Sequence, residues 1–181
     1  MVIIGNLKGY LGTAAPRRRG TEALNRVLWM ASAYDDFLEC VRRCAEQAGV
    51  FADTRITEDV LVCEALNCAA PASYRLTREE NQLLISLVTA DRWLSESIEA
   101  ELMHSGDNLE ELVEEELLDQ GYSGGPLPVQ HFRSNDLLYT FSSRLSLDDV
   151  PGDDHCTTAA QCLLAYEATF RELGDMHRKN R

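Results

Sequence analysis

The stretches ADTRITE (residues 52–58) and ADRWLSE (residues 90–96) share one pattern. Each has an Ala-Asp pair, two further residues, an aliphatic residue, and a Thr or Ser of the kind that caps a helix. Aspartate accepts backbone hydrogen bonds in tight turns, and the aliphatic side chain, Ile56 or Leu94, is suited to filling the corner. The repeat therefore predicts two similar corners, each joining a pair of packed helices.

Apolar residues between and around these corners recur mostly at helical spacing. Residues 77–80 match a capping box, and an apolar run to Val88 follows them. Helices are expected at residues 22–32, 35–49, 58–70, 77–88, 95–105, 108–117, 135–147 and 157–173. The one strand-like run, residues 137–141, fits helical spacing equally well. The prediction is an all-α fold, a compact bundle of about seven to nine helices built from repeated helical hairpins.

The sequence predicts a flexible N-terminal arm (1–20), a single helical domain (21–175) and a frayed basic tail (176–181). A Gly- and Pro-rich loop at 121–131 is a candidate sub-boundary within that domain. No run reaches the roughly 18 apolar residues that cross a bilayer, and no secretory pattern opens the chain. A cytoplasmic protein is therefore expected.

The order of helix, Ala-Asp, two-residue turn, aliphatic residue, Ser or Thr and acidic helix resembles the TerB-like domains, named for a bacterial tellurite-resistance protein. The matching residues are Ala52, Asp53, Ile56, Thr57, Ala90, Asp91, Leu94 and Ser95. Residues 147–151 are also similar to helical segments found near stress-associated AAA-type ATPases. Over residues 35–173 the resemblance implies a non-enzymatic interaction module in bacterial stress response or defence, with an ATPase or a membrane protein as its partner.

Members of this family are thought to gather carboxylates around a divalent metal. Five acidic residues would converge here if the two corners packed side by side: Asp53, Glu58, Asp91, Glu96 and Glu99. Calcium and manganese prefer such oxygen ligands. The alternative is that the aspartates accept turn amides and the glutamates favour helix N-termini. No cofactor other than this cation is expected.

Six cysteines form a second set of candidate ligands: Cys40, Cys44, Cys63, Cys68, Cys156 and Cys162. A zinc site would combine the first four, or His155 with the last two. None has the two-residue spacing by which a tight turn presents two thiolates to zinc. Cysteine is readily buried as a small hydrophobe, and disulfides are disfavoured in the cytosol. We therefore expect free structural thiols.

The chain has four histidines, His104, His131, His155 and His177. None of them has a neighbouring nucleophile with a recognisable catalytic signature. Asp153, Asp154 and His155 could together serve a metal or acid–base chemistry, but a polar loop before a helix explains them equally well. The sequence therefore predicts a protein that is not an enzyme and has no catalytic residue.

Negative charge is concentrated in residues 91–120, which hold eleven acids and one base of a chain with a formal charge of −13. That balance argues against a general nucleic-acid binder. It fits either a solvated helix face or a docking surface for a basic protein partner. The candidate partner-binding residues are Trp93, Glu110, Glu111, Glu114, Glu115 and Glu116. Trp93 would give such a surface an aromatic anchor, although burial in the corner is the expected place for its side chain. An alternative function is an acidic immunity or inhibitor protein that neutralises a basic toxin or a nucleic-acid enzyme.

Overall fold

The structure is a computed structural model that describes residues 19–79, 82–147 and 154–177, with side chains from Ala33 onward. The helices are α1 (Arg19–Ala48), α2 (Arg92–Ser105), α3 (Leu109–Asp119), α4 (His155–Arg171) and the short 3₁₀ helix η2 (Gly174–Met176). The strands are β1 (Phe51–Thr57), β2 (Val60–Ala65), β3 (Ala72–Glu79), β4 (Gln82–Thr89), β5 (Gln130–Arg133) and β6 (Tyr139–Leu145). They form one antiparallel sheet in the order β1-β2-β3-β4-β6-β5.

The fold is therefore α+β, and the predicted all-α bundle of seven to nine helices is wrong. The error lies in three segments that were expected to be helical, residues 58–70, 77–88 and 135–147. They form β2, the β3–β4 hairpin and β6. The helices expected over 95–105, 108–117 and 157–173 do exist, as α2, α3 and α4.

Helix α1 is one continuous helix where the sequence predicted two. It ends at Gly49, whose φ of +67° is easily adopted by glycine. The chain divides into two compact units, with the boundary between Ala33 and Tyr34 inside this helix. In the second unit Leu38, Val41 and Ala45 point one stripe of α1 into the core. The predicted arm falls largely in residues 1–18 and the predicted tail partly in 178–181, outside the described residues.

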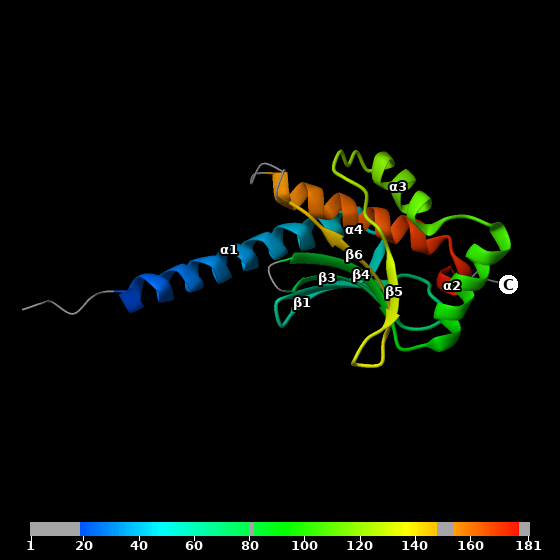
Figure 1. Ribbon diagram of the computed structural model, residues 1–181, viewed down its shortest axis with the longest axis horizontal. Coiled ribbons are helices and arrows are strands. Elements are labelled where there is room, and N and C mark those ends of the chain that lie inside the picture. Colours follow the sequence, from blue (N-terminus) through cyan, green and yellow to red (C-terminus); the bar gives the residue numbers. More distant parts are fainter. Residues whose placement is uncertain (1–18, 80–81, 148–153, 178–181) are drawn as a thin grey trace, which may run out of the picture. The chain divides into compact units, whose positions relative to one another are not determined.

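The core lies on one face of the sheet. Leu76, Ile85 and Leu87 alternate with residues that face the other way, so the strand period of two sets which side chains are buried together. Helix α4 packs on this face, and α3 packs on α4 (Figure 1). The Tyr166 hydroxyl on α4 hydrogen-bonds the Ser143 hydroxyl on β6, which satisfies a polar pair inside the core.

The two Ala-Asp segments do not form related corners. Asp53 lies within strand β1, and the chain turns later, at Glu58 and Asp59, where φ is positive. Asp91 instead is the N-cap of α2, with its carboxylate accepting a hydrogen bond from the Leu94 amide at 2.8 Å. The predicted structural repeat is wrong. The two segments on which the TerB-like resemblance was based are therefore not structurally equivalent.

None of the described helices is long and apolar enough to span a membrane.

Candidate functional site: an acidic groove between helices α2, α3 and α4

Helices α2 and α3 bury one apolar stripe each and expose their acids. Asn108 caps α3 by accepting a hydrogen bond from the Glu110 amide at 2.9 Å, and Gly106 ends α2 in the left-handed conformation. Ile98 and Val113 are fully buried, so each helix is fixed on the molecule with its polar face outward. The acidic side chains of residues 91–120 therefore lie mainly on the outer faces of α2 and α3.

A hollow of about 270 Å³ opens where these helices meet the C-terminal half of α4. We call it the acidic groove. Its ten lining residues include five carboxylates and no Lys or Arg: Glu101, Ser105, Asp107, Leu112, Glu115, Glu116, Ala168, Thr169, Glu172 and Leu173. The carboxylates of α2, α3, the loop between them and the C-cap of α4 thus line the groove together with apolar side chains, an arrangement that suits a cationic group on an aliphatic stem.

The electrostatics of the groove are those of crowded negative charge. Burial raises the pKa of Glu116, and the neighbouring Asp119 carboxylate raises it further, while Arg171 opposes the shift. Arg171 is itself engaged: it lies 3.1 Å from Glu167 and 3.4 Å from Glu172. Glu172 itself lines the groove, so this pairing engages one of its five carboxylates, and the other four leave the groove negative.

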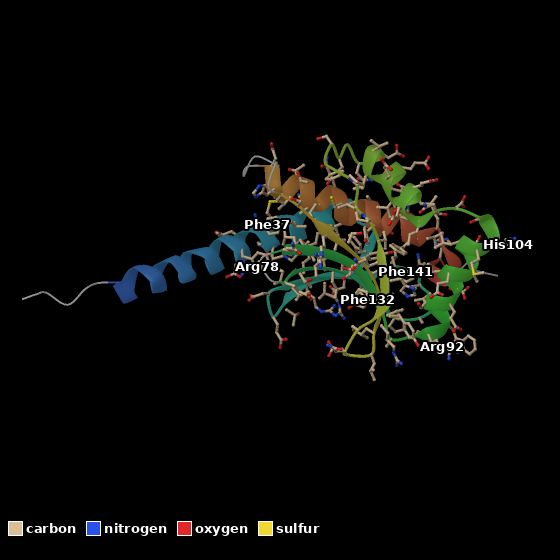
Figure 2. All side chains as sticks on the ribbon, in the orientation of Figure 1. Phe37, Arg78, Arg92, His104, Phe132 and Phe141 are labelled. Atoms are coloured by element: carbon tan, nitrogen blue, oxygen red, sulfur yellow. A yellow bond between two sulfur atoms is a disulfide. The ribbon has the colours of Figure 1, made fainter. Side chains whose placement is uncertain are left out.

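The structure brings only part of the predicted partner-binding set into the groove. Glu115 and Glu116 line it, whereas Glu110, Glu111 and Glu114 lie on α3 outside the lining. Trp93 is at the first turn of α2, and the groove is at the other end of that helix. Figure 2 labels Arg92 and His104 at these two ends.

Trp93 is 76 % exposed, so the expected burial in a corner is wrong. Met103 carries no signal in the sequence pattern, yet its apolar side chain is 86 % exposed near the end of α2 that lies at the groove. Exposed large apolar side chains of this kind are common anchors in protein interfaces.

The five predicted metal ligands are not gathered around one point. Asp53 pairs with Arg55 at 3.0 Å, Glu96 with Arg92 at 2.7 Å, and Glu99 with His131 at 3.2 Å. Asp91 caps α2, and Glu58 lies in the β1–β2 turn. In the parts of the chain that the structure describes, no group of three or more His, Cys, Asp or Glu side chains could hold a metal ion.

A chain of polar contacts that the sequence did not predict links β5 to α2. The Nε2 atom of His131 lies 3.1 Å from the Ser95 hydroxyl, and its Nδ1 atom lies 3.2 Å from the Glu99 carboxylate. The imidazole stacks on Phe141, with 3.9 Å between ring centroids. Ser95 and Glu99 are one helical turn apart on α2, but His131 is 36 positions after Ser95, and the only sequence signal was a histidine just after the Gly/Pro loop.

This Ser–His–Glu order is that of a hydrolase triad. However, Ser95 is only 1 % exposed, and neither Ser95 nor His131 lines the acidic groove. A nucleophile must reach a substrate, so the geometry favours a structural link between β5 and α2.

A second hollow, of about 280 Å³, lies on the sheet face opposite the core, between the end of the β3–β4 hairpin and strand β5. It is lined by Glu79, Gln82, Leu84, Pro128, Gln130, Phe132, Ser142 and Arg144. Its single acid and single base give it no strong charge, so it is a weaker candidate than the acidic groove.

The cysteines form neither of the zinc sets. Cys40 and Cys156 are joined in a disulfide, so the expectation of free thiols throughout is wrong for this pair. Cys63 and Cys162 are buried, and burial raises the pKa of each thiol to about 12, which makes both poor ligands and poor nucleophiles.

No protein-family model, no curated protein and no solved structure matches this chain, so its candidate site stands on its own geometry.

Proposed function

We propose that this chain is a non-enzymatic protein-interaction module whose acidic groove binds a basic segment of a protein partner. The observation that carries the proposal is the lining of the groove, with five carboxylates from α2, α3, the loop between them and the C-cap of α4, and no basic side chain. Charge complementarity of this kind speeds encounter and selects among partners.

The apolar lining of the groove adds selectivity for a side chain that has both an aliphatic stem and a cationic head. Leu112, Ala168 and Leu173 line the groove together with the carboxylates and offer apolar contact. Lysine and arginine both bury their stems along such surfaces while the charged head meets an acid.

The test is a binding titration followed by fluorescence anisotropy, with a labelled synthetic peptide of alternating Lys and Leu as the probe. The variant Glu101→Lys/Glu115→Lys reverses two charges of the groove. The control Asp35→Lys/Asp36→Lys makes the same change in net charge at two exposed positions on α1. We expect the groove variant to raise the Kd at least about tenfold, equivalent to about 1.4 kcal/mol, and the control to raise it less than about twofold.

Equal losses in the two variants would mean that the peptide responds only to net charge, which would overturn the groove as the binding site. Full affinity in the groove variant would overturn the proposal as well. A circular-dichroism spectrum of each variant checks that the fold is intact.

A further inference from the structure

The disulfide between Cys40 and Cys156 joins two helices that lie at opposite ends of the described chain. The two residues are 116 positions apart, and their Cα atoms are 6.0 Å apart. Cys40 is on α1 and Cys156 is in the first turn of α4. The whole sheet, with α2 and α3, therefore lies between them in sequence.

The bridge can be reached by a thiol from solvent. Cys40 is exposed and Cys156 is half-buried, in contrast to the fully buried thiols of Cys63 and Cys162. Thiol–disulfide exchange requires a thiolate to approach one sulfur and displace the other. Attack on the exposed Cys40 sulfur makes Cys156 the leaving group. The N-terminus of a 17-residue helix stabilises negative charge on that leaving thiolate.

The rest of each helix is held without the bridge. Residues 154–157 of α4 are exposed or half-buried, and the N-cap Asp154 makes no side-chain capping hydrogen bond. From Ala159 onward α4 is anchored by core side chains, including Leu163 and Phe170, which are fully buried. On α1, Leu38 and Val41 do the same. Loss of the bridge would thus release the first turn of α4 and leave the core in place.

We propose that Cys40–Cys156 is a reversible redox clamp on the first turn of α4. A dithiol reductant opens it: one thiolate attacks the Cys40 sulfur, the S–S bond breaks, and Cys156 leaves as a thiolate that takes up a proton. The second thiol of the reductant then resolves the mixed disulfide and releases Cys40 as a thiol. Two electrons and two protons pass to the protein, the reductant becomes a disulfide, and a small-molecule disulfide oxidant reverses the reaction.

The test uses the full chain without denaturant, treated with dithiothreitol and then with oxidised glutathione. Alkylation followed by mass spectrometry reports each cysteine, and hydrogen exchange reports residues 154–160. We expect Cys40 and Cys156 to become alkylated together, faster exchange confined to the first turn of α4, and recovery of the bridge on oxidation.

The reduced chain should still unfold cooperatively, with a melting temperature lower by about 10 °C. Cys44→Ser, one helical turn from Cys40, is the control and should leave the cycle unchanged.

The variant Cys40→Ser/Cys156→Ser should reproduce the reduced state. Three results would each overturn the clamp. The first is a bridge that resists the reductant until denaturant is added. The second is a reduction that unfolds the chain and exposes Cys63 and Cys162 to alkylation. The third is a failure of Cys40 and Cys156 to pair on oxidation. The first two would indicate a permanent structural disulfide. All three use the natural sequence, so a double variant that fails to fold would not leave the proposal undecided.

Discussion

His131 links two elements through one imidazole ring, and its surroundings determine which protonation state the fold favours. Burial lowers the pKa of His131, and the Glu99 carboxylate only partly opposes that shift. The neutral ring stacks on Phe141 and meets the Ser95 hydroxyl. Because the folded-state pKa lies below the unfolded value, the folded protein binds the proton less well. The stabilisation by neutral His131 is therefore present above about pH 6.5 and is lost as the pH falls.

The variant His131→Gln should lower the free energy of unfolding by about 1–2 kcal/mol at neutral pH, since it loses the ring stack and one hydrogen bond. This difference between wild type and variant should narrow as the pH falls below about 6.5. Urea unfolding at a series of pH values measures it. His131→Phe keeps a ring against Phe141 but cannot titrate. The difference in free energy of unfolding between this variant and wild type should therefore also change in favour of the variant as the pH falls. If the difference widened on acidification, the ion pair with Glu99 would dominate and the argument from burial would be wrong.

At the scale of elements, η2 packs against α2 through a backbone approach that only glycine permits. Gly174 has a φ of +52°, and a Cβ atom there would lie 2.6 Å from the Ser97 carbonyl carbon and 2.7 Å from the Ile98 amide nitrogen. The Ser97 hydroxyl also accepts a hydrogen bond from the Asp175 amide at 3.0 Å. The chain after α4 is thus fixed to α2 by both contact and hydrogen bonding.

Replacing Gly174 with Ala should therefore lower the free energy of unfolding by about 2–4 kcal/mol, the sum of left-handed strain and a clash with backbone atoms. Gly49→Ala is the matched control: its φ is also positive, but its added Cβ would meet nothing within 4 Å. The control should lose only about 1 kcal/mol. Equal losses in the two variants, measured by urea unfolding, would mean that the close approach to α2 contributes nothing.

The sequence predicted the helices of this fold well and its strands poorly, for a physical reason. In β4, Leu84 and Val88 lie on the face opposite Ile85 and Leu87, so both faces carry apolar residues and the period of two is hidden. A helix satisfies its backbone within one segment, whereas β6 pairs with β4 across more than fifty residues of sequence. Local periodicity contains no information about such partners.

The same limit applies to the candidate site. The acidic run singled out Glu115 and Glu116 as candidate partner-binding residues, which stays a prediction; in the structure both line the acidic groove, and Glu116 is half-buried there. Glu101 and Glu172 join them only because α2 and α4 pack beside α3. The disulfide was missed for the same reason, since its two cysteines are brought together by the sheet between them. Tertiary packing, which no local pattern encodes, assembles both features.

For the molecule as a whole, the uneven charge has a consequence for stability. The formal charge is −13, and most of it falls in residues 91–120. Like charges gathered on one side repel one another and oppose the compact state. Glu116 shows part of this crowding: burial is the main cause that raises its pKa, and the Asp119 and Glu115 carboxylates raise it further. The exposed ion pairs, such as Arg92 with Glu96, have little opposing effect, since surface salt bridges contribute only about 0–1 kcal/mol each.

Raising the ionic strength from about 0.01 M to about 0.15 M shortens the Debye length from about 30 Å to about 8 Å and screens this repulsion. The melting temperature of the oxidised protein should therefore rise by about 3 °C, as an increase in stability of about 1 kcal/mol would produce. Glu101→Lys/Glu115→Lys should lose most of this response, because it removes charge at the centre of the repulsion. Asp35→Lys/Asp36→Lys, with the same net charge, should retain it. Thermal melts followed by circular dichroism measure the response of each variant to salt. A melting temperature that falls with added salt would show that attractive ion pairs dominate. An equal response in the two variants would show that the repulsion is spread over the whole surface rather than concentrated around the acidic groove.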